Sequence, residues 1–146
     1  MRIYVASSWR NEPYPQVVDA LRADGHDVYD FRNPPGGTGF SWQQVDASNA
    51  RDIDSYFRAL DTDIAARGFD SDRLHLDDCE GLLLVLPCGR SAHLEAGYAI
   101  GQGKTVVVLL HEDKFEPELM YLLAGRANIV STLDEARAIL SQAGTL

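Results

Sequence analysis

The chain is poor in cysteine and has no long apolar run. Cys79 and Cys88 are its only two cysteines among 146 residues. Two are too few for a disulfide scaffold, and they lack the Cys-x-x-Cys spacing of redox or zinc sites, so we expect free thiols. The apolar runs are far shorter than the roughly 20 residues that cross a bilayer. The chain also opens on a strand pattern and not on a secretory signal, so we expect a cytoplasmic protein that does not contact a membrane.

Basic residues are also scarce, with 13 Lys and Arg against 22 Asp and Glu and a net charge of −9. Binding to a nucleic-acid polymer depends on many phosphate contacts, so this charge argues against such a partner. A small anionic ligand remains compatible with the charge if a few arginines gather at one site. The histidines are scattered without metal-ligand spacing, so we expect no metal and no other cofactor.

Length and a hydrophobic content of 45% fit one globular domain over residues 1–146. Strand and helix patterns alternate along it. We expect strands over residues 2–6, 27–31, 81–86, 105–110 and 128–130, and helices over residues 13–23, 72–78, 117–124 and 133–141, with a further helix around Glu95. This alternation predicts an α/β fold, a doubly wound five-stranded parallel sheet of the flavodoxin or Rossmann-like type with order 2-1-3-4-5. A ligand would then bind where the loops after the first and third strands diverge.

Residues 81–104, GLLLVLPCGRSAHLEAGYAIGQGK, carry the strongest functional signal. A buried strand is followed by a turn and a helix, and we expect Glu95 in the first turn of that helix. There the helix dipole would keep the carboxylate ionised and free N–H groups could hold an anion. An ionised carboxylate in this place is a candidate nucleophile. Asp72 could act with it on a glycosidic bond, but its spacing alone is weak evidence, and the alternative is a solvated surface carboxylate or a helix cap.

Three segments together resemble the nucleoside 2-deoxyribosyltransferase superfamily, which includes nucleotide N-glycoside hydrolases. They are the opening IYVASSWRN, the acidic stretch before the third strand, and GRSAHLEAGYAIGQGK, and the resemblance covers nearly the whole chain. It implies that Glu95 is the catalytic carboxylate and that the Tyr4 hydroxyl holds it. Asp72, eight residues before Glu80, is by the same resemblance the acid on the side of the base.

The resemblance also implies a binding site for a 5′-phosphate. Ser8 and Arg10 match the serine and arginine that the monophosphate hydrolases use, and an arginine fork suits phosphate geometry. The full set of expected substrate-binding residues is Ser7, Ser8, Trp9, Arg10, Gly89, Arg90 and Ser91. Gly89 stands where transferases often have an aspartate, which favours hydrolysis. Met120 or its apolar neighbours stand where the hydrolases have a serine from a neighbouring subunit, which weakens the prediction of phosphate binding.

The sequence therefore predicts an enzyme that cleaves the N-glycosidic bond of a nucleotide or nucleoside, with a nucleoside 5′-monophosphate N-glycosidase first. A nucleoside 2-deoxyribosyltransferase, a non-catalytic nucleotide-binding protein and a nicotinamide dinucleotide glycohydrolase remain as alternatives. Residues 33–48 are a candidate lid because a loop this long in a compact chain is often functional. Residues 115–123 are too apolar for a solvated helix and predict a homodimer or larger homo-oligomer.

Overall fold

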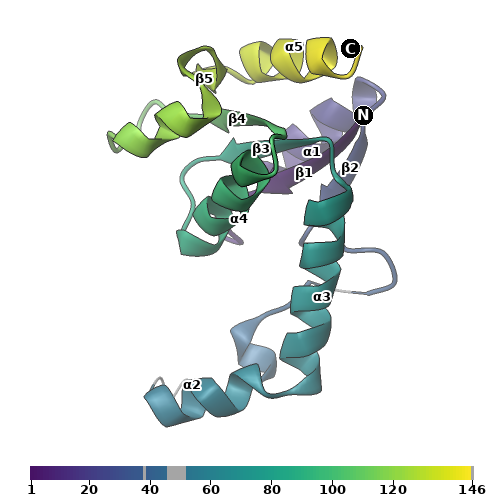
Figure 1. Cartoon of the computed structure of the whole chain (residues 1–146), viewed down its shortest axis with the longest axis vertical. Coiled ribbons are helices and arrows are strands. Elements are labelled where there is room, and N and C mark those ends of the chain that lie inside the picture. Colours follow the sequence, from purple (N-terminus) through teal and green to yellow (C-terminus); the bar gives the residue numbers. More distant parts are fainter. Residues whose placement is uncertain (38, 46–51, 146) are drawn as a thin grey trace.

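A computed structural model shows a five-stranded sheet with helices on both faces (Figure 1). It describes residues 1–37, 39–45 and 52–145. The strands are β1 (Arg2–Ala6), β2 (Asp27–Asp30), β3 (Gly81–Val85), β4 (Thr105–Leu109) and β5 (Ile129–Val130). All neighbouring strands pair in parallel in the order β2-β1-β3-β4-β5. The predicted doubly wound sheet, with its first and third strands side by side, is confirmed.

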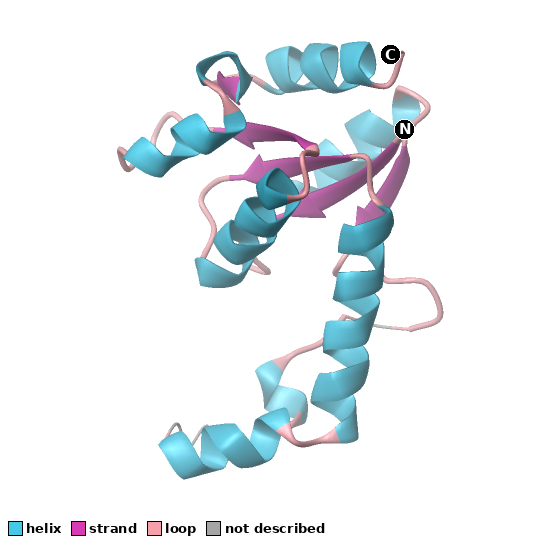
Figure 2. Cartoon of the chain, in the orientation of Figure 1, coloured by secondary structure: helices cyan, strands magenta, loops and turns pink. Residues whose placement is uncertain are grey.

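The helices connect these strands as an α/β fold requires (Figure 2). The α-helices are α1 (Tyr14–Ala23), α2 (Ile53–Leu60), α3 (Asp63–Asp78), α4 (Arg90–Gly101) and α5 (Leu133–Ala143). The described residues also form the short 3₁₀ helices η1 (Trp42–Gln44), η2 (Leu119–Ala124) and η3 (Arg126–Asn128). Among the described residues, no helix combines the length and the apolar character needed to cross a membrane.

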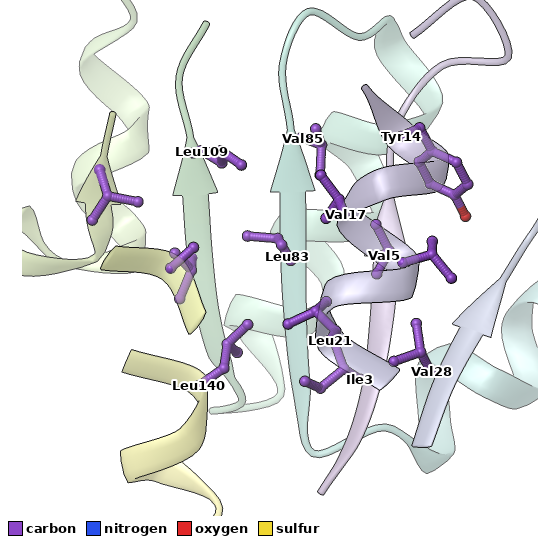
Figure 3. Close-up of a cluster of buried hydrophobic side chains, with 14 residues drawn as sticks. Ile3, Val5, Tyr14, Val17, Leu21, Val28, Leu83, Val85, Leu109 and Leu140 are labelled. Atoms are coloured by element: carbon purple, nitrogen blue, oxygen red, sulfur yellow. The ribbon is translucent and has the colours of Figure 1, made fainter. Parts of the chain in front are cut away.

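One face of the sheet is covered by α1 and α5. Residues of alternate parity along the strands, such as Val5 and Leu83, point to this face and are fully buried. Leu21 of α1 and Leu140 of α5 pack against them in one apolar cluster (Figure 3). This layer has no acid of the predicted site and serves as the structural core.

The opposite face carries the predicted site, because α3 and α4 cover it. Tyr4 and Leu84 point to this side from β1 and β3, into a cluster with Leu76 of α3. Helix α4 contributes the small buried residues Ala92 and Ala96, which let it lie close to the strands. Residues on this face of α4 are therefore held near the side chains that rise from β1.

Helix α3 is much longer than predicted. The sequence predicted a helix over residues 72–78, whereas α3 spans 16 residues and places Asp72 in its interior. Gly68 obscured the helical pattern, yet the structure requires a small residue there, since a Cβ atom on Gly68 would lie 2.8 Å from the Cβ atom of Phe40. Helix α2, which was not predicted, precedes α3. Together with η1 and the N-terminal part of α3 it forms an arm that extends away from the sheet (Figure 1).

The helix predicted over residues 117–124 differs from the structure in its kind, because the segment forms a 3₁₀ helix and not an α-helix. Only the 3₁₀ helix η2 forms there, and it begins after an extended Glu118 whose carboxylate accepts a hydrogen bond from the Met120 N–H at 2.8 Å. It ends at Gly125, which has a φ of +90° that favours glycine. The apolar residues of this segment therefore form a short 3₁₀ helix with exposed side chains, and not the α-helix that their apolar character suggested.

Candidate active site

The loops after β1 and β3 meet at the carboxyl edge of the sheet, as the strand order predicts. The Ser7 hydroxyl donates a hydrogen bond to the Val85 carbonyl at 2.9 Å. The Asn11 side-chain amide donates to the Pro87 carbonyl at 3.2 Å. These two contacts tie the loops together at the point where a doubly wound sheet binds its ligands.

Asp72 and Glu95 line the same open cleft, which lies between α3 and α4 and has a volume of about 530 Å³. Ser91 also lines it. Most of the remaining wall is apolar, and its largest apolar side chains are Phe40, Trp42, Leu60, Phe69, Leu76 and Leu94. The cleft thus combines two carboxyl groups with surfaces on which a flat ring can stack.

The predicted location and charge of Glu95 are both wrong in detail. Helix α4 begins at Arg90 after the N-cap residue Gly89, so Glu95 lies in its second turn, beyond the free N–H groups of the first. Burial and the nearby charge of Asp72 raise the pKa of Glu95 to about 8. The carboxyl is therefore mostly protonated at neutral pH, whereas a first-turn position would have kept it ionised.

Tyr4 lies beneath Glu95 and has no exposed surface. Burial first, and then the charge of Glu95, raise the pKa of its phenol well above the ordinary value. The hydroxyl makes no hydrogen bond of normal geometry to the described residues, yet as a neighbouring donor it lowers the pKa of Glu95. We interpret the pair as a close contact that tightens when Glu95 ionises, since a carboxylate is the stronger acceptor.

Asp72 reaches the cleft from the interior of α3. Its Oδ1 atom accepts a hydrogen bond of 2.8 Å from the Tyr29 hydroxyl. Burial raises the pKa of Asp72, and the Tyr29 bond opposes that shift. The structure thus brings the two predicted acids together across two helices, and the charge of Asp72 raises the cost of ionising Glu95.

Four predicted binding residues lie in the loop after β1, outside the described wall of the acid cleft. Ser7 uses its proton on Val85, and Ser8 Oγ accepts from the Arg10 N–H at 3.2 Å. Arg10 is exposed, so its guanidinium faces solvent. Trp9 is 51% exposed and packs edge-on against Phe31. Phosphate binding by this loop stays a prediction.

The facing loop supplies the other three predicted residues. Gly89 and Arg90 are exposed at the start of α4, and a Cβ atom on Gly89 would meet nothing within 4 Å, so the space before the helix is open. Ser91 continues this edge into the acid cleft. Binding of an anion by these N–H groups stays a prediction.

Sequence reasoning missed two residues that organise the site. Tyr29 supports Asp72 from β2, and Arg32 donates two hydrogen bonds through Nη2, to the Ser8 carbonyl at 2.7 Å and to the Asn11 carbonyl at 2.9 Å. The Arg32 guanidinium also lies 4.4 Å from the Tyr14 ring centre. Tyr29 could have been found from the sequence, because it is an aromatic residue on the strand next to β1 and points to the same face of the sheet as Tyr4. No sequence pattern indicated the role of Arg32.

Within the described ranges, no group of three or more histidine, cysteine, aspartate or glutamate side chains lies close enough to hold a metal ion. The two cysteines are free, and Cys79 is buried. Two carboxyl groups, with the phenols of Tyr4 and Tyr29 beside them, meet at the cleft.

The sheet order defines a doubly wound α/β protein, a class in which ligands generally bind at the topological switch point. Several solved structures are similar to this chain. A CMP N-glycosidase from Clostridium botulinum is 16% identical with a TM-score of 0.56, over 97% of this chain and 99% of that one. A 2-deoxyribosyltransferase from Bacillus psychrosaccharolyticus is 17% identical with a TM-score of 0.58, over 94% of this chain and 90% of that one.

A conserved protein from Enterococcus faecalis is also similar, at 16% identity and a TM-score of 0.58, over 97% of this chain and 98% of that one. No family model and no curated protein sequence matches the chain. At these identities the similarity shows the fold alone. The protein has the nucleoside 2-deoxyribosyltransferase-like fold, as its sequence predicts.

Proposed function

We propose that this protein is an enzyme that cleaves the N-glycosidic bond of a nucleoside 5′-monophosphate and releases the free base. The observation that carries the proposal is the convergence of Asp72 and Glu95 on one cleft, with the buried Tyr4 hydroxyl behind Glu95. The N-glycosidase and the deoxyribosyltransferase of the same fold support the general class of reaction. The apolar walls fit a base and a sugar, neither of which carries charge.

In the proposed reaction, Glu95 stabilises or attacks C1′ as its bond to the base breaks. Asp72 gives a proton to the departing base, and Tyr4 holds Glu95 once it is ionised. Water then attacks C1′ and gives a proton to Asp72, which is now ionised, and any bond between Glu95 and C1′ breaks to return the Glu95 carboxylate. The sugar phosphate leaves with a new hydroxyl group. If a second base occupied the leaving-base position, the same intermediate would give transfer.

The mechanism needs one proton on the pair of acids. At rest that proton lies on Glu95, because burial and the charge of Asp72 raise the pKa of Glu95 to about 8. As the glycosidic bond breaks, positive charge at C1′ favours ionised Glu95, so Glu95 passes its proton to Asp72, which gives it to the departing base as negative charge grows there. The developing charge therefore moves the pair into the arrangement that the reaction requires.

Arg10 provides the test of the substrate class. We expect wild-type protein to release base faster from monophosphates than from nucleosides, and Arg10→Ala to remove most of that preference. One charge-assisted contact contributes roughly 1.5 to 3 kcal/mol, or about tenfold to more than a hundredfold in specificity. Chromatography for free base, with a panel of nucleosides, monophosphates and nicotinamide dinucleotides, measures it. Arg126→Ala, distant in sequence and outside both predicted binding loops, is the matched control.

The same panel separates the alternatives. Equal turnover of nucleoside and monophosphate would contradict a role for the phosphate and favour a 2-deoxyribosyltransferase. Addition of a second free base would test for that activity, because a transferase would form a new nucleoside from it. Release of nicotinamide alone would indicate a dinucleotide glycohydrolase. Tight binding of a nucleotide without release of base would identify a non-catalytic binder and contradict the proposed enzyme.

A homodimer or larger homo-oligomer is the proposed assembly. Large apolar side chains are exposed over residues 115–123, and the most exposed of them are Leu119, Met120 and Leu123. We expect light scattering at micromolar concentration to give at least twice the mass of the 16.1 kDa chain, because such a surface is normally covered. A Leu119→Glu variant should shift the mass toward monomer, and a wild-type monomer would contradict the assembly. Location in the cytoplasm stays a prediction of the sequence.

A further inference from the structure

Beneath the acid cleft, two tyrosines stand side by side on neighbouring strands. Tyr4 of β1 pairs with Tyr29 of β2 in the parallel register, so both side chains point to the face covered by α3 and α4. Their ring centres are 5.1 Å apart. One ring lies below Glu95 and the other below Asp72, so each acid of the site has its own phenol.

We propose that Tyr29 is a positioning residue for Asp72, holding its carboxyl toward the leaving base in the proposed reaction. The Tyr29 hydroxyl donates to Asp72 Oδ1 at 2.8 Å and lies 3.2 Å from the Ser71 hydroxyl. The role of Asp72 toward a leaving base rests on the proposed function, whereas the contact between Tyr29 and Asp72 is a feature of the structure.

Tyr29 is itself held in place from several sides, which a positioning residue requires. Only 8% of its surface is exposed. Its ring stacks on His75 with centres 3.8 Å apart and planes 14° from parallel. The His75 ring is fixed in turn by a 2.7 Å contact between Nδ1 and the Ser71 carbonyl. The hydroxyl therefore has little freedom to leave Asp72, and removal of its oxygen alone would leave the ring packing intact.

The bond also affects the proton that the acids share. Tyr4 from β1, Tyr29 from β2 and Glu95 from α4 face Asp72, and His75 lies one turn along its own helix. Tyr29 donates to the ionised form of Asp72 and so lowers its pKa against the effect of burial. Without that donor, Asp72 would become protonated at a higher pH while Glu95 still holds its own proton. The two acids would then carry two protons, whereas the proposed reaction needs one.

The Tyr29→Phe variant tests the proposal. We expect kcat for base release to fall about tenfold or more because the acid loses its orientation, with KM changed less than about twofold. The acidic limb of the pH profile should rise by about one pH unit, since the carboxylate loses a charged hydrogen bond. A variant with unchanged kcat and an unchanged limb would overturn the assignment.

Tyr14→Phe is the matched control. The Tyr14 hydroxyl donates to Asp30 Oδ1 at 2.8 Å, so it is another buried bond between a tyrosine and an aspartate, and it lies in the core cluster on the other face of the sheet. We expect this variant to lose stability without moving the pH profile. An equal movement of the profile in both variants would assign Tyr29 a merely structural role.

A second measurement keeps the proposal separate from the proposed function. Titration of the Asp72 carboxyl by NMR needs no substrate. A higher Asp72 pKa in Tyr29→Phe, but not in Tyr14→Phe, supports the positioning role even if wild-type protein releases no base, in which case only the proposed function fails. An unshifted Asp72 pKa overturns the role whatever the activity.

Discussion

Glu95→Gln should lose base release almost completely while the sheet stays folded. The amide has the shape of the acid but cannot become the anion that stabilises positive charge at C1′. Loss of such a group costs on the order of 10²-fold or more in rate. Glu95→Ala should lose as much. Free base released from a monophosphate, measured by chromatography under single-turnover conditions, gives the rate.

Glu112→Gln is the matched control for this loss. Glu112 is an exposed acid of the loop after β4 and lies outside the described wall of the acid cleft. We expect its removal to leave turnover close to the wild-type value. Normal base release by Glu95→Gln would show that another group is the catalytic carboxylate and would end the proposed mechanism.

The topology could be predicted because local patterns determine it. Short apolar strands that alternate with helices allow few arrangements, and right-handed crossovers leave the order 2-1-3-4-5 as the natural choice. That order was enough to bring the loop after β1 against the loop after β3. The long arm was not predicted, because Gly68 and the acids around it weaken the apolar pattern of α3, whereas contact with Phe40 and a Thr62 cap favour the helix.

The chemistry of the site could be predicted only in part. The resemblance identified Asp72 and Glu95, and the structure places them in one cleft. Their protonation depends on burial and on mutual repulsion between residues of two different helices, which no local pattern encodes. Tyr29 was missed for a related reason, since its position below Asp72 follows from the register between β1 and β2 and from the length of α3.

Glu95 should also make the wild-type protein less stable at alkaline pH. Below its ordinary pKa of 4.5 the group is protonated in both the folded and the unfolded states. Between pH 4.5 and about 8 the folded state binds the proton and the unfolded state does not, so each pH unit lowers the free energy of unfolding by up to about 1.4 kcal/mol. Above about pH 8 the folded protein carries the buried charge and the full cost remains.

Glu95→Gln removes this cost, so the substitution that abolishes activity should stabilise the fold at high pH. We expect its free energy of unfolding at pH 9 to exceed that of wild type by roughly 1 to 4 kcal/mol, and the difference to shrink at pH 5. Urea unfolding at both pH values measures it, and Glu112→Gln should show no such dependence. A difference that stayed the same at pH 5 and pH 9 would mean that Glu95 is ionised in the folded protein at neutral pH. If Glu95→Gln loses turnover and gains stability at high pH, Glu95 is a catalytic group whose buried charge destabilises the fold. Replacement of a purely structural carboxyl would instead make the protein less stable.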